Sequence, residues 1–202
     1  MSNPFVISAD EIKKYFPKYS PKTASEFHRE SARLADKIFE NTIKIIPQKV
    51  IILGGGTASG KTEYLSQYLH VFGKAGGIFF DGTLPNFEGA QIKLKNVLKN
   101  KRELEIHFIF PKNLQEAFTV FMNRDRQFSD EHFYRTHSNS RKTLLEIVKK
   151  FPEVRIRLIE SRFTKNIETM IFEEKILNSK AEQIDFLQNF QYTEKEIIQV
   201  VL

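Results

Sequence analysis

The stretch VIILGGGTASGKTEY, residues 50–64, contains the clearest structural signal in this chain of 202 residues. Its apolar run, residues 50–53, is typical of a buried strand and ends at three successive glycines. Beyond the glycines, residues 61–72 carry Leu65, Leu69 and Phe72 at helical spacing. A strand, a glycine-rich turn and a helix in this order predict a loop whose backbone approaches a ligand closely.

The turn matches the pattern G-x-x-x-x-G-K-[ST] at every position. The matching residues are Gly55, Gly56, Thr57, Ala58, Ser59, Gly60, Lys61 and Thr62. Glycines allow successive backbone N–H groups to face phosphate oxygens, and the start of the helix adds positive potential. Lys61 is expected to reach the β- and γ-phosphates, and the Thr62 hydroxyl to ligate Mg²⁺. We therefore expect a bound nucleoside triphosphate, ATP or GTP, because nothing in the loop identifies the base.

Strand and helix patterns alternate along the rest of the chain. Strands are expected at 4–8, 77–84, 104–110 and 154–160, and helices at 21–42, 87–97, 114–122, from Ser140 onward, and at 184–190. This alternation predicts an α/β fold with a mainly parallel sheet. Without an internal repeat or linker, the chain is expected to form one domain, residues 1–202, with a core at about 4–163 and a helical tail at about 164–202.

Composition limits the classes of partner. The net charge is +6 and the pI about 9.4, which favours anionic partners such as nucleotides, nucleotide sugars, nucleic acid or an acidic protein. The absence of cysteine excludes a disulfide framework and a thiolate zinc site. No apolar run is long enough to span a bilayer and the amino terminus lacks a signal pattern, so we expect a cytoplasmic protein without a membrane partner.

Two carboxylates follow predicted strands directly. Asp10 comes after the first strand, and Asp81 ends the strand beyond the glycine-rich loop, with Thr83 close behind. Parallel strands bind ligands beyond their carboxyl ends. Asp10 can therefore accept or orient an acceptor proton, and Asp81 can hold Mg²⁺ through water or bind an acceptor hydroxyl. The alternatives are a turn or helix cap at Asp10 and an ordinary Asp-Gly turn at Asp81.

The stretch RDRQFSDEHFYRTHSNSR, residues 124–141, is rich in arginine. Its arginines are Arg124, Arg126, Arg135 and Arg141, around a predicted loop between two helices. Such cations can neutralise the charge on a transferring phosphoryl group, or they can form a solvated face paired with nearby acids. The two histidines, His132 and His137, lack the spacing of a helical metal pair.

Three segments of the chain resemble the zeta toxin family of P-loop kinases: IILGGGTASGKTEY, ISADEIKKYFPKY and FFDGTL. The resemblance covers roughly residues 6–161, and the pairing of D-E-I-K-x-x-x-P with D-G-T is more specific than the loop alone. Members of this family phosphorylate a hydroxyl of UDP-N-acetylglucosamine and are held inactive by an antitoxin. The resemblance implies a P-loop kinase-like three-layer sandwich, a requirement for Mg²⁺ and an antitoxin partner.

The resemblance also implies a role for each matching residue. Asp10 would activate the acceptor, and Lys61 and Thr62 keep their phosphate and magnesium roles. Asp81 and Thr83 would lie near the sugar substrate. The phosphate-neutralising arginines would be Arg124 or Arg126, together with Arg135. Glu30 and Asp36 fall where a further carboxylate on the substrate side is expected.

One departure from the family is the order of segments. In the family the P-loop strand comes first, whereas here the strand and helix of Asp10 precede it. We therefore expect a permuted chain whose active-site residues keep their places, since termini that lie close together allow such a move. A second departure is that LPN, residues 84–86, stands after D-G-T instead of a basic residue.

These patterns favour a kinase that uses ATP or GTP and Mg²⁺ to phosphorylate a hydroxyl of a small anionic substrate, with UDP-N-acetylglucosamine as the leading candidate. One alternative is a kinase of a nucleoside or a polynucleotide end, which the basic pI permits. Another is a non-catalytic module whose bound nucleotide controls a partner. Asp10 distinguishes them, because only a kinase needs it.

Overall fold

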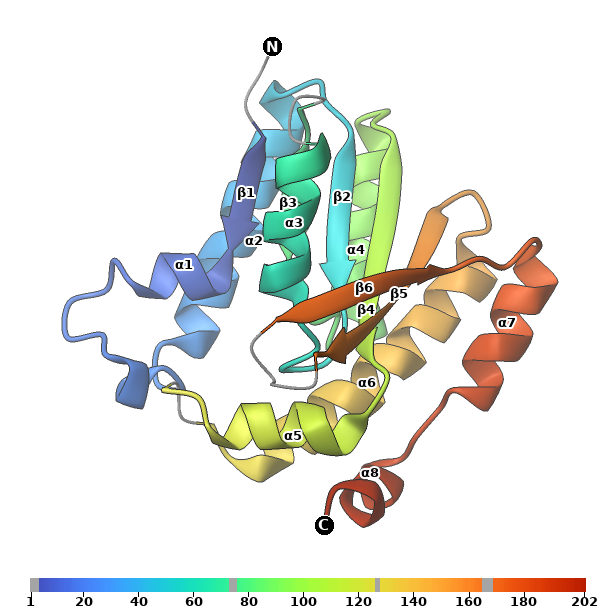
Figure 1. Ribbon diagram of the computed structural model, residues 1–202. Helices are drawn as coiled ribbons and strands as arrows, with labels where there is room; N and C mark the ends of the chain where they lie inside the picture. The colour runs from blue at the N-terminus through green and yellow to red at the C-terminus, as the bar shows by residue number, and fades with distance from the viewer. Residues whose placement is uncertain (1–3, 73–75, 126–127, 165–168) are drawn as a thin grey trace.

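Six strands form one sheet in the computed structural model, which describes residues 4–72, 76–125, 128–164 and 169–202. The strand order is β1-β3-β2-β4-β5-β6 (Figure 1). The strands are β1 (Phe5–Ser8), β2 (Val50–Gly54), β3 (Ile78–Asp81), β4 (Leu104–Pro111), β5 (Arg155–Phe163) and β6 (Met170–Lys175). The first five pair in parallel and β6 pairs antiparallel with β5. The predicted α/β fold with a mainly parallel sheet is confirmed.

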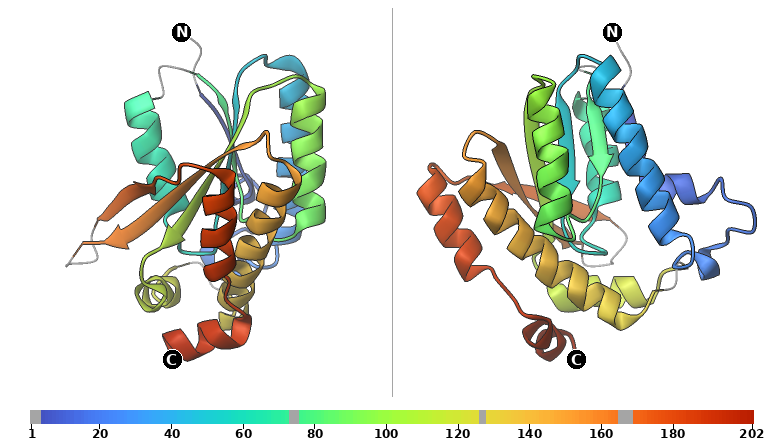
Figure 2. Two further views of the ribbon diagram at one scale, coloured as in Figure 1. Left: turned by 90° about the vertical axis from the view of Figure 1, so that its right-hand side faces the viewer. Right: turned by 180° about the vertical axis from the view of Figure 1, so that it is seen from behind.

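Helices cover both faces of the sheet. They are α1 (Ala9–Lys13), α2 (His28–Ile45), α3 (Lys61–Phe72), α4 (Phe87–Lys99), α5 (Leu114–Met122), α6 (Asp130–Lys150), α7 (Lys180–Asn189) and α8 (Glu194–Val201). Figures 1 and 2 show α2, α4 and α6 on one face and α3 on the other, which gives three layers. Within the described residues, no helix combines the length and the apolar character needed to cross a bilayer.

The core follows from the apolar pattern of the central strands. All five residues of β2 are buried, and successive side chains point to opposite faces of the sheet. Ile52 packs on the face covered by α2, α4 and α6, whereas Ile51 and Leu53 pack with Tyr64 and Leu65 of α3. Full burial of one such aliphatic side chain contributes about 1.5–3 kcal/mol. The continuous apolar run therefore places β2 in the middle of the molecule.

The front strand β1 joins the same sheet as β2, as expected. It pairs with β3, whose other neighbour is β2. In this register Asp81 is level with both Ser8 and Leu53. The residues that follow β1, β2 and β3 therefore meet at one edge of the sheet.

Two expected helix starts are wrong. Ser20 and Pro21 open only a 3₁₀ turn, η1 (Pro21–Thr23), and α2 begins later, at His28. The ring of Phe27 packs on Phe16 at 5.5 Å between centroids, which ties this segment to the loop after α1. Ser140 does not begin a helix, because it lies inside α6, where its hydroxyl donates a hydrogen bond to the His137 carbonyl at 3.3 Å.

The expected helical tail contains a strand. β6 pairs along β5, and the ring of Phe172 packs on Tyr64 of α3 at 5.4 Å. Ion pairs from Arg157 to Glu174 and from Arg162 to Glu173 join the two strands. The apolar stretch of β6 is too short to predict a strand by itself, and the partner strand supplies the missing interactions.

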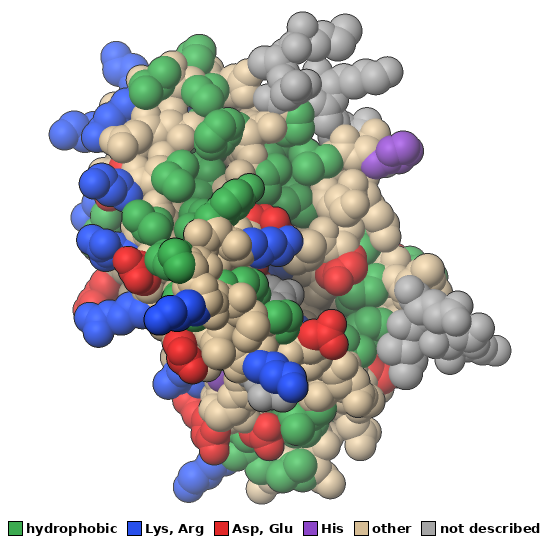
Figure 3. All heavy atoms as spheres, turned by 90° about the vertical axis from the view of Figure 1, so that its left-hand side faces the viewer, with side chains coloured by type: hydrophobic (Ala, Val, Ile, Leu, Met, Phe, Trp, Pro, Cys, Tyr) green, Lys and Arg blue, Asp and Glu red, His purple; other side chains and the backbone are tan. Residues whose placement is uncertain are grey.

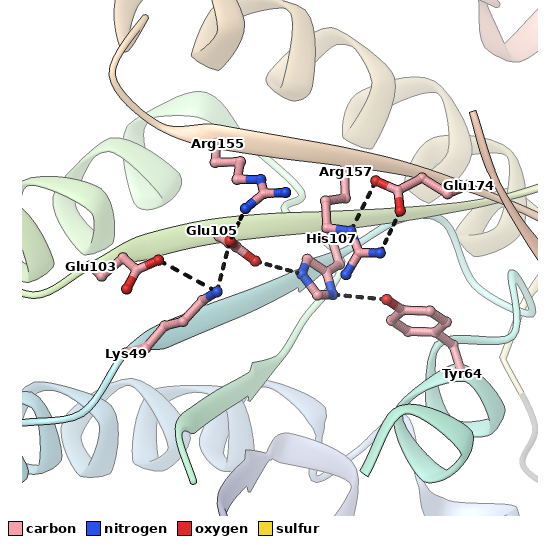
Figure 4. Close-up of polar contacts among 8 residues, drawn as sticks. All are labelled: Lys49, Tyr64, Glu103, Glu105, His107, Arg155, Arg157 and Glu174. Carbon is pink, nitrogen blue, oxygen red and sulfur yellow. Dashed lines mark hydrogen bonds and ion pairs between the residues drawn. The ribbon is translucent and has the colours of Figure 1, made fainter. Parts of the chain in front are cut away.

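Buried polar groups connect α3 with β4 (Figure 4). The Tyr64 hydroxyl lies 2.9 Å from Nδ1 of His107, and Nε2 of the same ring lies 3.2 Å from Glu105. Lys49 also pairs with Glu105, at 2.7 Å. Hydrogen bonds from His107 and Lys49 hold the pKa of Glu105 at about 2, and burial lowers the pKa of His107. A neutral imidazole that accepts from tyrosine and donates to glutamate satisfies all three groups.

Stability is expected to fall in mild acid because of His107 and His137. Both rings are buried, and burial is the main cause that lowers both pKa values. The unfolded chain binds these protons near pH 6.5, whereas the folded chain does not, so stability is lost as pH falls below about 6.5. The linkage slope is at most about 1.4 kcal/mol per pH unit for each histidine. Denaturant unfolding at pH 7.5, 6.5 and 5.5 measures this slope, which His107→Gln should reduce; a slope unchanged by that substitution would contradict the assignment.

Candidate active site

The glycine-rich residues 55–62 connect β2 to α3 at the carboxyl edge of the sheet. Gly55 has a φ of 131°, and a Cβ built there would lie 2.0 Å from the carbonyl oxygen of Ile109. Only glycine fits this position, because both the backbone angle and the neighbouring strand exclude a side chain. Helix α3 begins at Lys61, and Thr62 is exposed in its first turn.

Lys61 bends back over the loop. Its Nζ donates hydrogen bonds to the carbonyl oxygens of Gly55 at 3.0 Å and Gly56 at 2.7 Å. Desolvation of the ammonium group lowers the pKa of Lys61 to about 8, while the charge of Asp81 acts in the opposite direction. A desolvated cation beside a loop of this kind favours an anionic ligand.

Helix α6 braces the loop at Thr57. The backbone N–H of Thr57 donates to the Thr136 hydroxyl at 3.1 Å, and Nε2 of His137 lies 2.7 Å from the Thr57 carbonyl oxygen. A Cβ on Gly56 would lie 2.4 Å from the His137 ring, so the loop packs directly on the imidazole. Sequence reasoning missed this brace, because it considered His137 only as a metal ligand and no local pattern links these distant segments.

The acid at the end of β3 faces the loop lysine. Among charged neighbours, Asp81 has the largest effect on the pKa of Lys61. The Ser8 hydroxyl at the end of β1 donates to Oδ2 of Asp81 at 3.3 Å. Thr83 follows two residues later and is partly buried. The structure thus places Asp81 close enough to Lys61 for its charge to raise the pKa of that lysine.

Asp10 lies at the same edge, in the first turn of α1. The Ser8 hydroxyl caps this helix by accepting from the Asp10 N–H at 3.3 Å. Nζ of Lys13 donates to Oδ1 of Asp10 at 2.8 Å, with the lysine side chain fully buried and the aspartate side chain 42% exposed. The charge of Asp10 raises the pKa values of both Lys61 and His28. Asp10 is therefore both a capped helix residue and a carboxylate close to the loop lysine.

The arginines separate into different environments. Arg124 is partly buried in the loop between α5 and α6, and its charge lowers the pKa of Lys61. Arg135 is exposed on α6, and its charge lowers the pKa values of His28 and His132 instead. Arg126 lies outside the described residues. The expectation that Arg141 belongs to this cationic loop is wrong, because its side chain is buried inside the molecule.

The two further carboxylates on α2 differ. Glu30 is exposed in the first turn of α2, two residues after His28. The charge of Asp10 raises the pKa of His28, so this turn is on the Asp10 side of the molecule. Asp36 pairs with Lys93 of α4 at 2.9 Å. Eight residues of helix place Asp36 roughly 12 Å along the axis from His28. Asp36 therefore links two covering helices, and its expected place on the substrate side is not supported by these contacts.

Basic side chains also gather over α2, along one border of the face drawn in Figure 3. The exposed basic residues of this helix are Arg29, Arg33, Lys37 and Lys44. Their spacing follows the outer face of the helix, opposite the buried Phe39. Part of the positive net charge therefore lies on a solvated helix face.

No family model matches the chain, and no curated protein matches it. Solved structures with a similar chain path include the following two. The AvrRxo1-ORF1:-ORF2 complex contains a chain with 12% identity and a TM-score of 0.47, with 92% of this chain and 89% of that chain covered. A structure of the PezAT chromosomal toxin-antitoxin system of Streptococcus pneumoniae gives 15% identity, a TM-score of 0.38 and coverage of 88% and 93%. Neither likeness identifies a reaction.

Proposed function

We propose that this protein is a kinase that transfers the γ-phosphate of ATP or GTP to a hydroxyl group of a small anionic acceptor. One observation carries the proposal. Asp10, from the front of the chain, lies at the same edge of the sheet as Lys61, and its charge raises the pKa of Lys61. A site that only binds nucleotide has no need of this carboxylate. A phosphoryl-transfer site needs one to orient or deprotonate the attacking hydroxyl.

The proposed reaction assigns one role to each group. The acceptor oxygen forms a bond to the γ-phosphorus as its proton passes to Asp10. The bond from that phosphorus to the oxygen that bridges it to the β-phosphate breaks, and ADP or GDP leaves. Lys61 and Arg124 neutralise the charge on the transferring group and the leaving phosphate. The buried ammonium of Lys13 fixes the Asp10 carboxylate through its hydrogen bond to Oδ1.

The residues present also fit Mg²⁺. The hydroxyl of Thr62 and the carboxylate of Asp81 are oxygen ligands, the type that Mg²⁺ prefers, directly or through water. Both groups are near Lys61: Thr62 is the next residue in the chain, and the charge of Asp81 raises the pKa of Lys61. When bound there, Mg²⁺ would supply positive charge that offsets the negative charge of the nucleotide phosphates.

For the acceptor, we propose a nucleotide sugar such as UDP-N-acetylglucosamine, on the strength of the motif resemblance described above. Thr83 and Glu30 are the candidate contacts for its hydroxyl groups. The same resemblance leads us to propose an antitoxin protein as a partner. A kinase of a nucleoside or a polynucleotide end is the second candidate, because the protein has a basic pI of about 9.4.

Label transfer from γ-labelled ATP tests this function. Purified protein with Mg²⁺ is incubated with a panel of nucleotide sugars, nucleosides and oligonucleotides, and products are separated by chromatography. Label on a nucleotide sugar supports the first candidate, and label on a nucleoside or an oligonucleotide end supports the second. Nucleotide binding without transfer to any member of the panel would favour a non-catalytic module.

The arginines are expected to differ in their effect on this reaction. Arg124→Ala should lower kcat on the order of a hundredfold with little change in ATP affinity, because charge develops on the phosphoryl group during transfer. Arg135→Ala should mainly raise the KM for the acceptor, because the charges of Arg135 and Asp10 both influence the pKa of His28, which puts Arg135 nearer to Asp10 than to Lys61 in its electrostatic effect. Arg33→Ala, at an exposed position of α2, is the control. Equal losses in all three variants would instead indicate a general effect of surface charge.

A further inference from the structure

Arg141 is a buried cation without a carboxylate partner in the described parts of the chain. Arg141 lies in the middle of α6, and its relative exposure is only 1%. Burying an unpaired guanidinium is costly, and an apolar side chain of similar size would fill the space without this cost. The position of the charge therefore calls for a specific interaction.

Aromatic rings from the connector between α7 and α8 enclose this guanidinium. Its central carbon lies 4.4 Å from the centre of the Phe190 ring and 5.3 Å from that of Tyr192. Gln191, between them, donates from Nε2 to the backbone carbonyl of Arg141 at 3.3 Å. Cation–π contacts of this kind are strongest in sites from which water is excluded. Residues 190–192 therefore clamp Arg141 in place.

The same guanidinium contacts His137, one helical turn earlier. Nη1 of Arg141 donates to the His137 carbonyl at 2.9 Å and lies 3.4 Å from Nδ1 of its ring. Arginine can only donate, so Nδ1 is the acceptor and the ring proton of the neutral imidazole is on Nε2. Nε2–H then donates to the carbonyl of Thr57 at 2.7 Å. The contacts form a continuous path from the connector to the phosphate-binding loop.

We propose that Arg141 and His137 are positioning residues for the phosphate-binding loop, and that the Phe190–Tyr192 connector sets the loop by holding Arg141. Arg141 at Nδ1 and the Thr57 carbonyl at Nε2 together favour the His137 tautomer that is protonated at Nε2. The imidazole also packs against Gly56. The inference rests on the proposed function in one respect, that the loop binds a nucleoside triphosphate. Hydrogen bonds to the second ring nitrogen of a histidine commonly fix its tautomer and its orientation in protein sites.

The first test reads the tautomer of His137 directly. In ¹⁵N-labelled protein, the His137 ring signals, assigned with His137→Gln, should show a neutral ring protonated at Nε2. Arg141→Met keeps the bulk and removes the donor at Nδ1, so only the Thr57 carbonyl still favours the Nε2–H form. A measurable fraction of the Nδ1–H tautomer is therefore expected beside it. A ring that stays wholly in the Nε2–H form in a folded Arg141→Met protein would overturn the relay, since the arginine would then have no role in selecting the tautomer.

The second test measures binding of a non-hydrolysable ATP analogue with Mg²⁺ by calorimetry. Arg141→Met and Tyr192→Leu should weaken affinity about tenfold, which corresponds to about 1.4 kcal/mol. Phe186→Leu is the control within α7, because Phe186 packs on Phe110 and Phe190 and, among the described residues, makes no cation–π contact with Arg141. Phe186→Leu should lower the melting temperature as Tyr192→Leu does, but it should leave affinity unchanged.

The two tests separate the possible failures. Wild-type affinity in Tyr192→Leu, measured below its melting temperature, would overturn the role of the connector even if Arg141→Met does not fold. Equal loss of affinity in Phe186→Leu would also overturn it, because a general loosening of α7 would then explain the effect. If the wild-type protein binds no ATP analogue, the proposed function fails, while the tautomer of His137 still decides whether Arg141 acts on it.

Discussion

Asp10→Asn is expected to lower phosphoryl transfer by about a hundredfold or more while ATP binding is retained. Asparagine has the same shape as aspartate, but it cannot take the proton of the acceptor hydroxyl. Its amide oxygen can still accept the hydrogen bond from Lys13, so the helix should form. Lys13 is fully buried, however, and loses its charged partner, so a modest fall in melting temperature is also expected.

The chain offers a close control for this substitution. Glu11 is the next residue on the same helix and pairs with Lys14 at 2.7 Å, but both side chains are largely exposed. Glu11→Gln should leave turnover and stability nearly unchanged, because exposed ion pairs contribute little. An Asp10→Asn protein with wild-type turnover, or an equal loss in Glu11→Gln, would contradict the assigned role of Asp10. Steady-state transfer assays with both variants decide between these outcomes.

Lys61→Ala is expected to reduce transfer on the order of a thousandfold or more and to weaken ATP binding. The substitution removes the cation nearest to the expected β- and γ-phosphates and the one that Asp81 and Arg124 both act on. Thr62→Ala should mainly lower Mg²⁺-dependent activity, measured by titrating Mg²⁺ at fixed ATP. Ser66→Ala, on the exposed side of α3, is the control. Full turnover in Lys61→Ala would show that the loop has only a structural role.

The parts of the fold that sequence predicts well are those with local signals. The apolar run before Gly55 predicts β2, and the periodicity after Lys61 predicts α3, because both patterns reflect burial of the elements themselves. Predicting that Asp10 lies at the same edge of the sheet as Lys61 required more than local pattern. It followed from the rule that parallel strands present their carboxyl ends at one edge, which needs only the prediction that β1 is parallel to the others.

The features that sequence could not predict depend on contacts between distant segments. Thr136 and His137 brace Thr57 only because α6 crosses beneath the loop, and no spacing in the sequence records that crossing. Arginine is usually exposed at the protein surface, so the sequence does not predict that Arg141 is buried. Its burial depends on rings from the connector after α7. The start of α2 at His28 similarly depends on aromatic packing rather than on the capping residues.

The central claim is that the front segment and the phosphate-binding loop form one phosphoryl-transfer site. A crystal structure with Mg²⁺ and a non-hydrolysable ATP analogue measures the distance from the Asp10 carboxylate to the γ-phosphorus most directly. The account predicts phosphates held by residues 55–62, with that distance on the order of 6 Å, which leaves room for one hydroxyl oxygen between the two groups. A γ-phosphate that points away from Asp10, or a nucleotide bound elsewhere, would contradict it.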